Sequence, residues 1–131
     1  MKYMLDTDIF SYMVNGVPQV LERYAEVADQ EIYLSVISHG EILFGIAKQQ
    51  PGVSKQKRIA YLLDQMSIAL MDEDAARCYG SVRNALELSG KPIGSNDTWI
   101  AAHAMSLGAT LVTGNLREYK RVAGLKVENW L

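Results

Sequence analysis

Four acidic side chains stand at positions where an α/β chain can bring them together. Asp6 directly follows the apolar run Lys2–Leu5, and Asp97 begins a predicted helix after a glycine-containing loop. Glu118 follows a later apolar run, and Glu41 lies within an otherwise apolar helical stretch. An ionised carboxylate beside apolar surface is costly unless a partner or a metal compensates its charge. These four residues are therefore our candidate catalytic acids.

The chemistry of such a set points to a hard divalent cation. Carboxylate oxygens and water are the usual ligands of Mg²⁺ and Mn²⁺, whereas the one cysteine and two histidines of this chain offer little for zinc. A divalent cation can polarise a phosphate and lower the pKa of a water molecule. The acids therefore favour phosphoryl chemistry. The alternative for each acid taken alone is a helix cap or a surface ion pair.

The elements that must position these acids alternate between strands and helices. β-branched and apolar runs predict strands at Lys2–Leu5, Glu31–Leu34, Ile68–Met71, Ala109–Thr113 and Lys126–Glu128. Helical periodicity predicts helices at Ile9–Val14, Val17–Ala28, Ser54–Met66, Asp72–Ser89, Asp97–Leu107 and Leu116–Lys120, and one from Ser35 or Ser38 to Ile46 or Lys48. Ser95 or Asn96 is expected to cap the helix of Asp97. The alternation predicts a parallel α/β sheet covered on both faces, which binds ligands beyond the carboxyl ends of its strands.

Length and composition narrow the class of protein. The chain has 131 residues, 49% of them hydrophobic and 21% charged, which predicts one globular domain over residues 1–131. No apolar run approaches the ~20 residues of a membrane span, and no signal peptide is visible. The lone Cys78 predicts a reduced compartment, so we expect a cytoplasmic protein. The net charge of −2 does not indicate a nucleic-acid binder, so that role would need a local basic patch or bound cations.

Four segments, in order along the chain, resemble the motifs of PIN-domain nucleases. They are Met4–Asp8 with Ser11, Ser35–Gly45 with Glu41, Pro92–Ala104 with Asp97, and Leu111–Val122 followed by Gly124, Leu125 and Trp130. The resemblance spans essentially the whole chain and is closest to the VapC toxins of type II toxin–antitoxin systems. It implies a Rossmann-like α/β/α sandwich with a central, mainly parallel sheet of about four to five strands.

The same resemblance implies an endoribonuclease that depends on Mg²⁺, or on Mn²⁺ in its place. It implies a homodimer and a VapB-type antitoxin whose C-terminal tail covers the acidic groove, with DNA contacted only through the antitoxin and no membrane partner. The Pro-Ile-Gly run before Asp97 and the Arg-Glu-aromatic run near the end resemble VapC enzymes that cut initiator tRNA, tRNA(fMet), in the anticodon stem-loop.

The site residues implied by the resemblance include the four candidate acids. Asp6, Glu41 and Asp97 match acidic positions of the family, with Asp6 and Asp97 as the principal metal ligands. Many relatives have Asp where this chain has Asn115, so Glu118 is the expected fourth acid. Residues expected near a substrate phosphate are Thr7, Thr113, Asn115, Arg83, Lys91 and Arg117, and further basic candidates for the RNA backbone are Lys48, Lys55, Lys57 and Arg58.

Several other distinctive residues are expected to have structural roles. Residues expected in the core or in packing contacts are His39, His103, Phe44, Cys78, Trp99 and Trp130. Tyr12 and Tyr61 fit either the core or a dimer or antitoxin surface.

Two rival functions stand beside the nuclease. Asp6-Thr7-Asp8 after an apolar strand resembles the motif of haloacid-dehalogenase-type phosphatases, with Asp6 as nucleophile. Against it, no matching Lys motif follows and Glu41 would have no role. The second rival is a PIN-like module that binds RNA or a partner without cleavage, which has no chemical reason to keep three costly acids.

Overall fold

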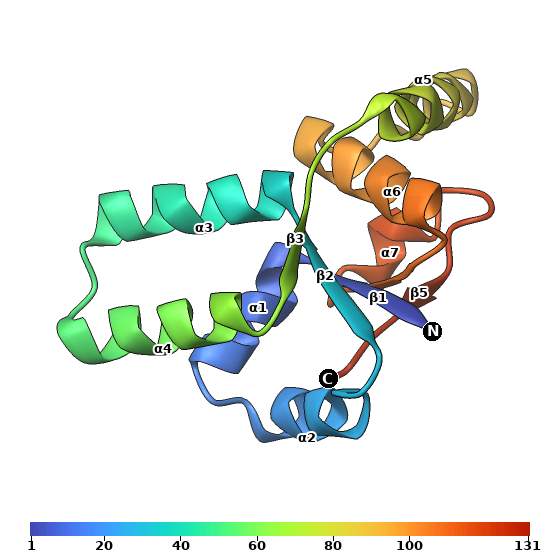
Figure 1. Ribbon diagram of the computed structural model, residues 1–131. Helices are drawn as coiled ribbons and strands as arrows, with labels where there is room; N and C mark the ends of the chain where they lie inside the picture. The colour runs from blue at the N-terminus through green and yellow to red at the C-terminus, as the bar shows by residue number, and fades with distance from the viewer.

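Side chains along the central strand alternate between two buried faces. In β1 (Lys2–Leu5), Tyr3 and Leu5 enter one hydrophobic core and Met4 enters another. The computed structural model describes all 131 residues and places a sheet between two layers of helices (Figure 1). Strands buried on both faces require continuous apolar runs, which explains the uninterrupted hydrophobic sequence of β1.

The sheet has five strands in the order β3-β2-β1-β4-β5, and all neighbouring pairs are parallel. The remaining strands are β2 (Glu31–Ser35), β3 (Ser67–Ala69), β4 (Thr110–Val112) and β5 (Val127–Glu128). The order reverses between β1 and β4, which lie side by side although most of the chain separates them. The expected parallel α/β sandwich is confirmed. Sheets of this kind bind ligands in the crevice at such a reversal.

Helices cover both faces of the sheet. On the Tyr3 face lie α1 (Thr7–Val14), α2 (Pro18–Glu26), α3 (Val36–Gln49) and α4 (Val53–Asp64). On the Met4 face lie α5 (Glu73–Leu88), α6 (Ser95–Leu107) and α7 (Leu116–Tyr119). In Figure 1, α3 and α4 extend away from the sheet and are joined at their outer ends, while α5 packs against α6.

Helix α6 begins at Ser95, two residues earlier than the sequence predicts, and this changes the position of the candidate acid Asp97. Neither Ser95 nor Asn96 caps the helix, because it begins at Ser95 and the extended residue before it is Gly94. Gly94 has no side chain to offer, and the Thr98 hydroxyl donates to its carbonyl oxygen at 2.9 Å. The earlier start places Asp97 within the first helical turn.

A buried polar contact joins the two layers through the sheet. Ser35 caps α3, as predicted, by accepting a hydrogen bond from the Ile37 N–H at 3.1 Å. The same hydroxyl lies 2.8 Å from Nδ1 of His103 on α6, which is 1% exposed. His103 therefore has the structural role that was expected of it.

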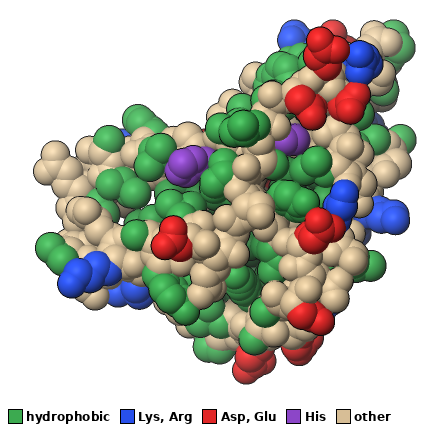
Figure 2. All heavy atoms as spheres, in the orientation of Figure 1, with side chains coloured by type: hydrophobic (Ala, Val, Ile, Leu, Met, Phe, Trp, Pro, Cys, Tyr) green, Lys and Arg blue, Asp and Glu red, His purple; other side chains and the backbone are tan.

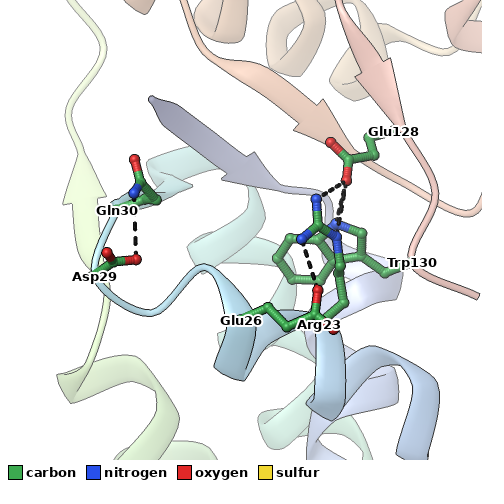
Figure 3. Close-up of polar contacts among 6 residues, drawn as sticks. All are labelled: Arg23, Glu26, Asp29, Gln30, Glu128 and Trp130. Atoms are coloured by element: carbon green, nitrogen blue, oxygen red, sulfur yellow. Dashed lines mark hydrogen bonds and ion pairs between the residues drawn. The ribbon is translucent and has the colours of Figure 1, made fainter.

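The C-terminal edge of the sheet is fastened to α2, as Figure 3 shows. Arg23 donates hydrogen bonds to Glu128 at 2.9 Å and to Glu26 at 3.0 Å. The Trp130 indole N–H donates to the same Glu128 oxygen at 3.2 Å. Its ring lies 6.0 Å from that of Tyr3, centroid to centroid, so Trp130 is the packing residue that the sequence predicted.

Two residues expected in the core lie closer to solvent. Phe44 is 66% exposed on α3, because Ile42 and Ile46 occupy the inward positions of that helix. Cys78 is half-buried. Of the undecided tyrosines, Tyr61 is exposed. None of the helices combines the length and the apolar character needed to cross a membrane.

Candidate active site

The predicted acids gather where the strand order reverses. Asp6 directly follows β1, and Glu118 lies on the short helix α7 that follows β4. Asp97 lies in the first turn of α6, where the N-terminal end of the helix favours negative charge. It is close enough to Asp6, Glu41 and Glu118 for their charges to interact. The fold therefore brings all four acids into one neighbourhood.

Asp6 is held from two sides. One carboxylate oxygen, Oδ1, accepts the Thr7 N–H at 2.9 Å. The other, Oδ2, accepts the Thr113 hydroxyl at 2.8 Å. Thr113 is fully buried, and its oxygen accepts the Asn115 N–H at 3.0 Å. Thr113 thus positions Asp6 and has no exposed surface for a substrate.

The two glutamates are each held by a neighbouring polar side chain. The Thr7 hydroxyl donates to Glu41 at 2.7 Å, which joins β1–α1 to α3. The Asn115 amide donates to Glu118 at 3.0 Å. Asn115 therefore orients the acid three residues later and contributes no charge of its own.

Burial is the main influence on the charge of Asp6. The side chain is only 6% exposed, and this desolvation, followed by the nearby charge of Asp8, raises its pKa from 3.8 to about 6. The hydrogen bonds from Thr113 and Thr7 oppose the rise, and the charge of Asp97 adds to it. Carboxylates whose pKa is strongly raised by burial are concentrated at functional sites, so the burial of Asp6 indicates a functional role.

The neighbouring acids respond in the same direction. Desolvation raises the pKa of Asp8 against hydrogen bonds from the Gly114 and Ile9 N–H groups. Desolvation also raises the pKa of Asp97, and the charges of the two glutamates add to the increase. Burial is thus the first cause of the raised pKa at all three aspartates, and neighbouring carboxylates add to it at Asp6 and Asp97.

No basic side chain neutralises this cluster. All ion pairs of the protein lie elsewhere, on α2, on α5 and between α2 and the end of β5. No three acids, histidines or cysteines converge closely enough to enclose one ion. Hydrated Mg²⁺ needs only one or two protein carboxylates. The oxygen-only chemistry and unpaired charge of Asp6 and Asp97 therefore fit a hydrated divalent cation.

Asp8 belongs to this site, although it was not among the predicted site residues. Its Oδ2 accepts the Gly114 N–H at 2.9 Å and so ties the loop after β1 to the loop after β4. A Cβ at position 114 would lie 2.7 Å from that oxygen, so the approach requires glycine. The sequence signal was present in the pair of an acid two residues after Asp6 and a glycine directly after Thr113.

The predicted basic residues are less well placed than the acids. Arg83 on α5 donates to Glu87 and to the Tyr79 hydroxyl, each at 3.0 Å, and makes no contact with the acids. Lys91 and Arg117 are exposed and have no ion-pair partner. In Figure 2, Lys and Arg side chains lie at the outer end of the α3–α4 arm, over α5 and at the right of the view, rather than in one basic patch.

Two hollows reach the site from the side of α3. One, of about 230 Å³, lies between α1, α3 and α4 and is lined by Thr7, Glu41 and Lys55 among others. The second, of about 650 Å³, is open and lies between α3 and Asn96 at the start of α6. Glu41 lines both. An extended ligand can thus approach the acids along α3.

Comparison with known proteins agrees with this geometry. The PIN domain family model matches residues 3–125. The chain is 33% identical to the Haemophilus influenzae ribonuclease VapC1 over 132 aligned positions, which cover 99% of this chain and 98% of that protein. It is 31% identical to the Shigella flexneri tRNA(fMet)-specific endonuclease VapC, with 99% and 98% covered.

Solved structures give the same result for the fold. The crystal structure of VapBC2 from Rickettsia felis, bound to a DNA fragment from its promoter, contains a chain that superposes with a TM-score of 0.93. That chain is 34% identical, and 100% of both chains is covered. VapC nucleases with a PIN domain are in general metal-dependent. The chain therefore belongs to the PIN-domain family and, within it, to the VapC ribonucleases.

Proposed function

We propose that this chain is the toxin of a type II toxin–antitoxin pair, and that it hydrolyses phosphodiester bonds in RNA with the help of Mg²⁺ or Mn²⁺. The observation that carries the proposal is the pair formed by the buried Asp6 and the partly buried Asp97, without an ion-pair partner, at the reversal of strand order. Full-length similarity to ribonucleases supports the same activity. We treat residues 1–131 as one functional domain.

In this proposal Asp6 and Asp97 hold the cation. When bound, it would polarise the phosphate and lower the pKa of the attacking water. Glu41 and Glu118, each fixed by a hydrogen bond, can orient that water and accept its proton. Thr113 keeps Asp6 in place.

Access to the site favours single-stranded or looped RNA. The hollows beside α3 reach Glu41, and the unstacked nucleotides of a single strand or loop can enter such hollows. Lys55 lines the first hollow and is the basic side chain best placed for a flanking phosphate. Arg117, Lys91 and Thr7 are further candidates for this contact, while the contacts of Arg83 lie on its own helix.

The substrate that we propose is initiator tRNA, cut in its anticodon stem-loop. The support is the similarity to a Shigella flexneri enzyme named for tRNA(fMet). Purified chain should cleave transcripts of initiator tRNA faster than those of an elongator tRNA with the same anticodon. Equal cleavage of the two tRNAs would rule out initiator tRNA as the specific substrate, but it would leave the ribonuclease activity standing.

We also propose a VapB-type antitoxin as the partner, because a structurally similar chain occurs in a VapBC complex on promoter DNA. DNA would be reached through the antitoxin, and the toxin would form a homodimer. Co-expression with the antitoxin of the same operon should relieve growth arrest caused by the toxin.

The activity itself is tested by incubating the purified chain with total RNA, in Mg²⁺ or in EDTA, and mapping new 5′ ends. We expect cleavage in Mg²⁺ only, and its loss in Asp97→Asn. Asp64→Asn changes an exposed acid without an ion-pair partner and serves as the matched control. Cleavage in EDTA, or full activity of Asp97→Asn, would contradict the proposal.

A further inference from the structure

The hydroxyl of Tyr119 is buried beside the acidic cluster without a hydrogen-bond partner. Tyr119 ends α7, is 0% exposed, and its oxygen is sealed from solvent. The hydroxyl lies within reach of the carboxylates of Asp97 and Asp6, although neither contact has the geometry of a regular hydrogen bond. A buried hydroxyl without a partner is expensive, so its presence at this place calls for an explanation.

The two principal acids differ in how they are held. Each oxygen of Asp6 accepts a hydrogen bond, from the Thr7 N–H and from the Thr113 hydroxyl. The Asp97 carboxylate accepts no regular hydrogen bond, and the Tyr119 hydroxyl is the one donor within reach that lowers its pKa. Carboxylates that bind metals are normally oriented by hydrogen bonds from surrounding groups. Asp6 is already held by two other donors, so Asp97 is the carboxylate that the Tyr119 hydroxyl is left to orient.

We infer that Tyr119 is a positioning residue for the cation site, whose hydroxyl donates a hydrogen bond to one oxygen of Asp97 and leaves the other free for a divalent cation. The inference rests on the proposed function. The hydroxyl is an O–H donor in a place that water does not reach, so no solvent molecule replaces it when it is removed. Tyr119 itself touches neither substrate nor cation in this assignment.

The substitution Tyr119→Phe tests the inference, because it removes one oxygen and keeps the ring that fills the core. The matched control is Tyr3→Phe, a tyrosine 5% exposed on the opposite face of the sheet, against Trp130. Mn²⁺ binding to the RNA-free chain is measured by titration calorimetry for wild type, both variants and Asp97→Asn. Thermal unfolding in EDTA checks the fold.

We expect Tyr119→Phe to bind Mn²⁺ about 10- to 100-fold more weakly than wild type, as for other groups that orient metal ligands. Tyr3→Phe should bind like wild type, and Asp97→Asn should not bind. In RNA cleavage, Tyr119→Phe should need more Mn²⁺ for half-maximal rate but approach the wild-type kcat at saturation. Its unfolding midpoint in EDTA should be unchanged or higher, because an unsatisfied hydroxyl is lost.

The outcomes separate this inference from the proposed function. If wild type binds Mn²⁺ and Tyr119→Phe binds it equally well, the positioning role is wrong and the nuclease assignment stands. If Tyr119→Phe has a lower unfolding midpoint in EDTA and normal Mn²⁺ affinity, the hydroxyl is structural. If wild type neither binds Mn²⁺ nor cleaves RNA, the proposed function itself is wrong, and the role of Tyr119 falls with it.

Discussion

The buried carboxylate of Asp6 lowers the stability of the folded chain at the position where a cation ligand is proposed. Its pKa is raised to about 6 mainly by burial, so the ionised form is disfavoured in the folded chain. The shift from 3.8 to about 6 corresponds to roughly 3 kcal/mol of lost stability once the group is ionised. A bound cation would compensate this cost in the working enzyme.

The substitution Asp6→Asn should therefore abolish RNA cleavage and stabilise the cation-free chain. Because the folded-state pKa is raised, wild type loses stability as the pH rises from 3.8 to about 6. At pH 8 in EDTA we expect the variant to be more stable by about 1–3 kcal/mol, and near pH 3.5 the difference should vanish. Urea unfolding at the two pH values measures it.

The exposed Asp64→Asn provides the comparison for this measurement, since it should change stability by less than ~0.5 kcal/mol at either pH. If Asp6→Asn were less stable than wild type at pH 8, the hydrogen bonds of Asp6 would outweigh the desolvation of its charge.

Thr113 makes a second prediction at the scale of one residue. Thr113→Val keeps the shape but removes the donor to Asp6 and the acceptor of the Asn115 N–H. We expect a loss of about 1–3 kcal/mol in unfolding free energy and a drop in cleavage rate of at least ~10-fold. Thr110→Val changes a buried threonine at the start of β4 that makes no side-chain hydrogen bond, and it should cost less in both measurements. Equal effects of the two substitutions would show that the hydroxyl of Thr113 does not act on Asp6.

The helices and strands that local pattern determines were predictable from the sequence. β1 has the predicted bounds Lys2–Leu5, and the other strands and helices begin and end within a few residues of prediction. The errors arise where tertiary packing decides. Phe44 and Ile42 lie in the same apolar stretch of α3, and only the position of the sheet determines that Ile42 faces inward.

The site was predictable as a set of acids but not as a network. Motif spacing identified Asp6 and Asp97, because each lies at a fixed point next to a strand or helix end. The contacts of Asp8 with Gly114 and of Tyr119 with the cluster join segments more than 20 residues apart. Sequence periodicity carries no information on such pairs. Asn115 likewise shows its role only beside Glu118.

At the scale of elements, Ser35 links the start of α3 to the interior of α6. Its hydroxyl caps α3 and contacts His103, so Ser35→Ala should lower the unfolding free energy by about 1–3 kcal/mol. Ser38 is equally buried, but its hydroxyl has no partner. Ser38→Ala is therefore the matched control and should be neutral or slightly stabilising. Chemical unfolding of both variants measures the difference, and a larger loss for Ser38→Ala would refute the linking role of Ser35.

The whole molecule is arranged around one strand-order reversal. The layer of α1–α4 supplies Asp6 and Glu41, and the layer of α5–α7 supplies Asp97 and Glu118. The two proposed cation ligands, Asp6 and Asp97, therefore come from different layers. The two layers meet through the sheet, its loops and a direct contact between α3 and α6, so the geometry of the site depends on the packing of both layers.

Divalent cations should therefore stabilise the complete fold. A ligand that binds only the folded state at 100 times its Kd adds about 2.7 kcal/mol, which for a domain of this size raises the Tm by roughly 10 °C. At pH 8 we expect Mn²⁺ to raise the Tm of wild type by this amount and the Tm of Asp97→Asn only slightly. At pH 5 the increase should shrink, because a proton competes for Asp6, whose pKa is about 6. Differential scanning calorimetry with and without Mn²⁺ at both pH values provides the measurement. An equal rise in Tm for wild type and Asp97→Asn would place the bound cation outside the cluster where the two layers meet.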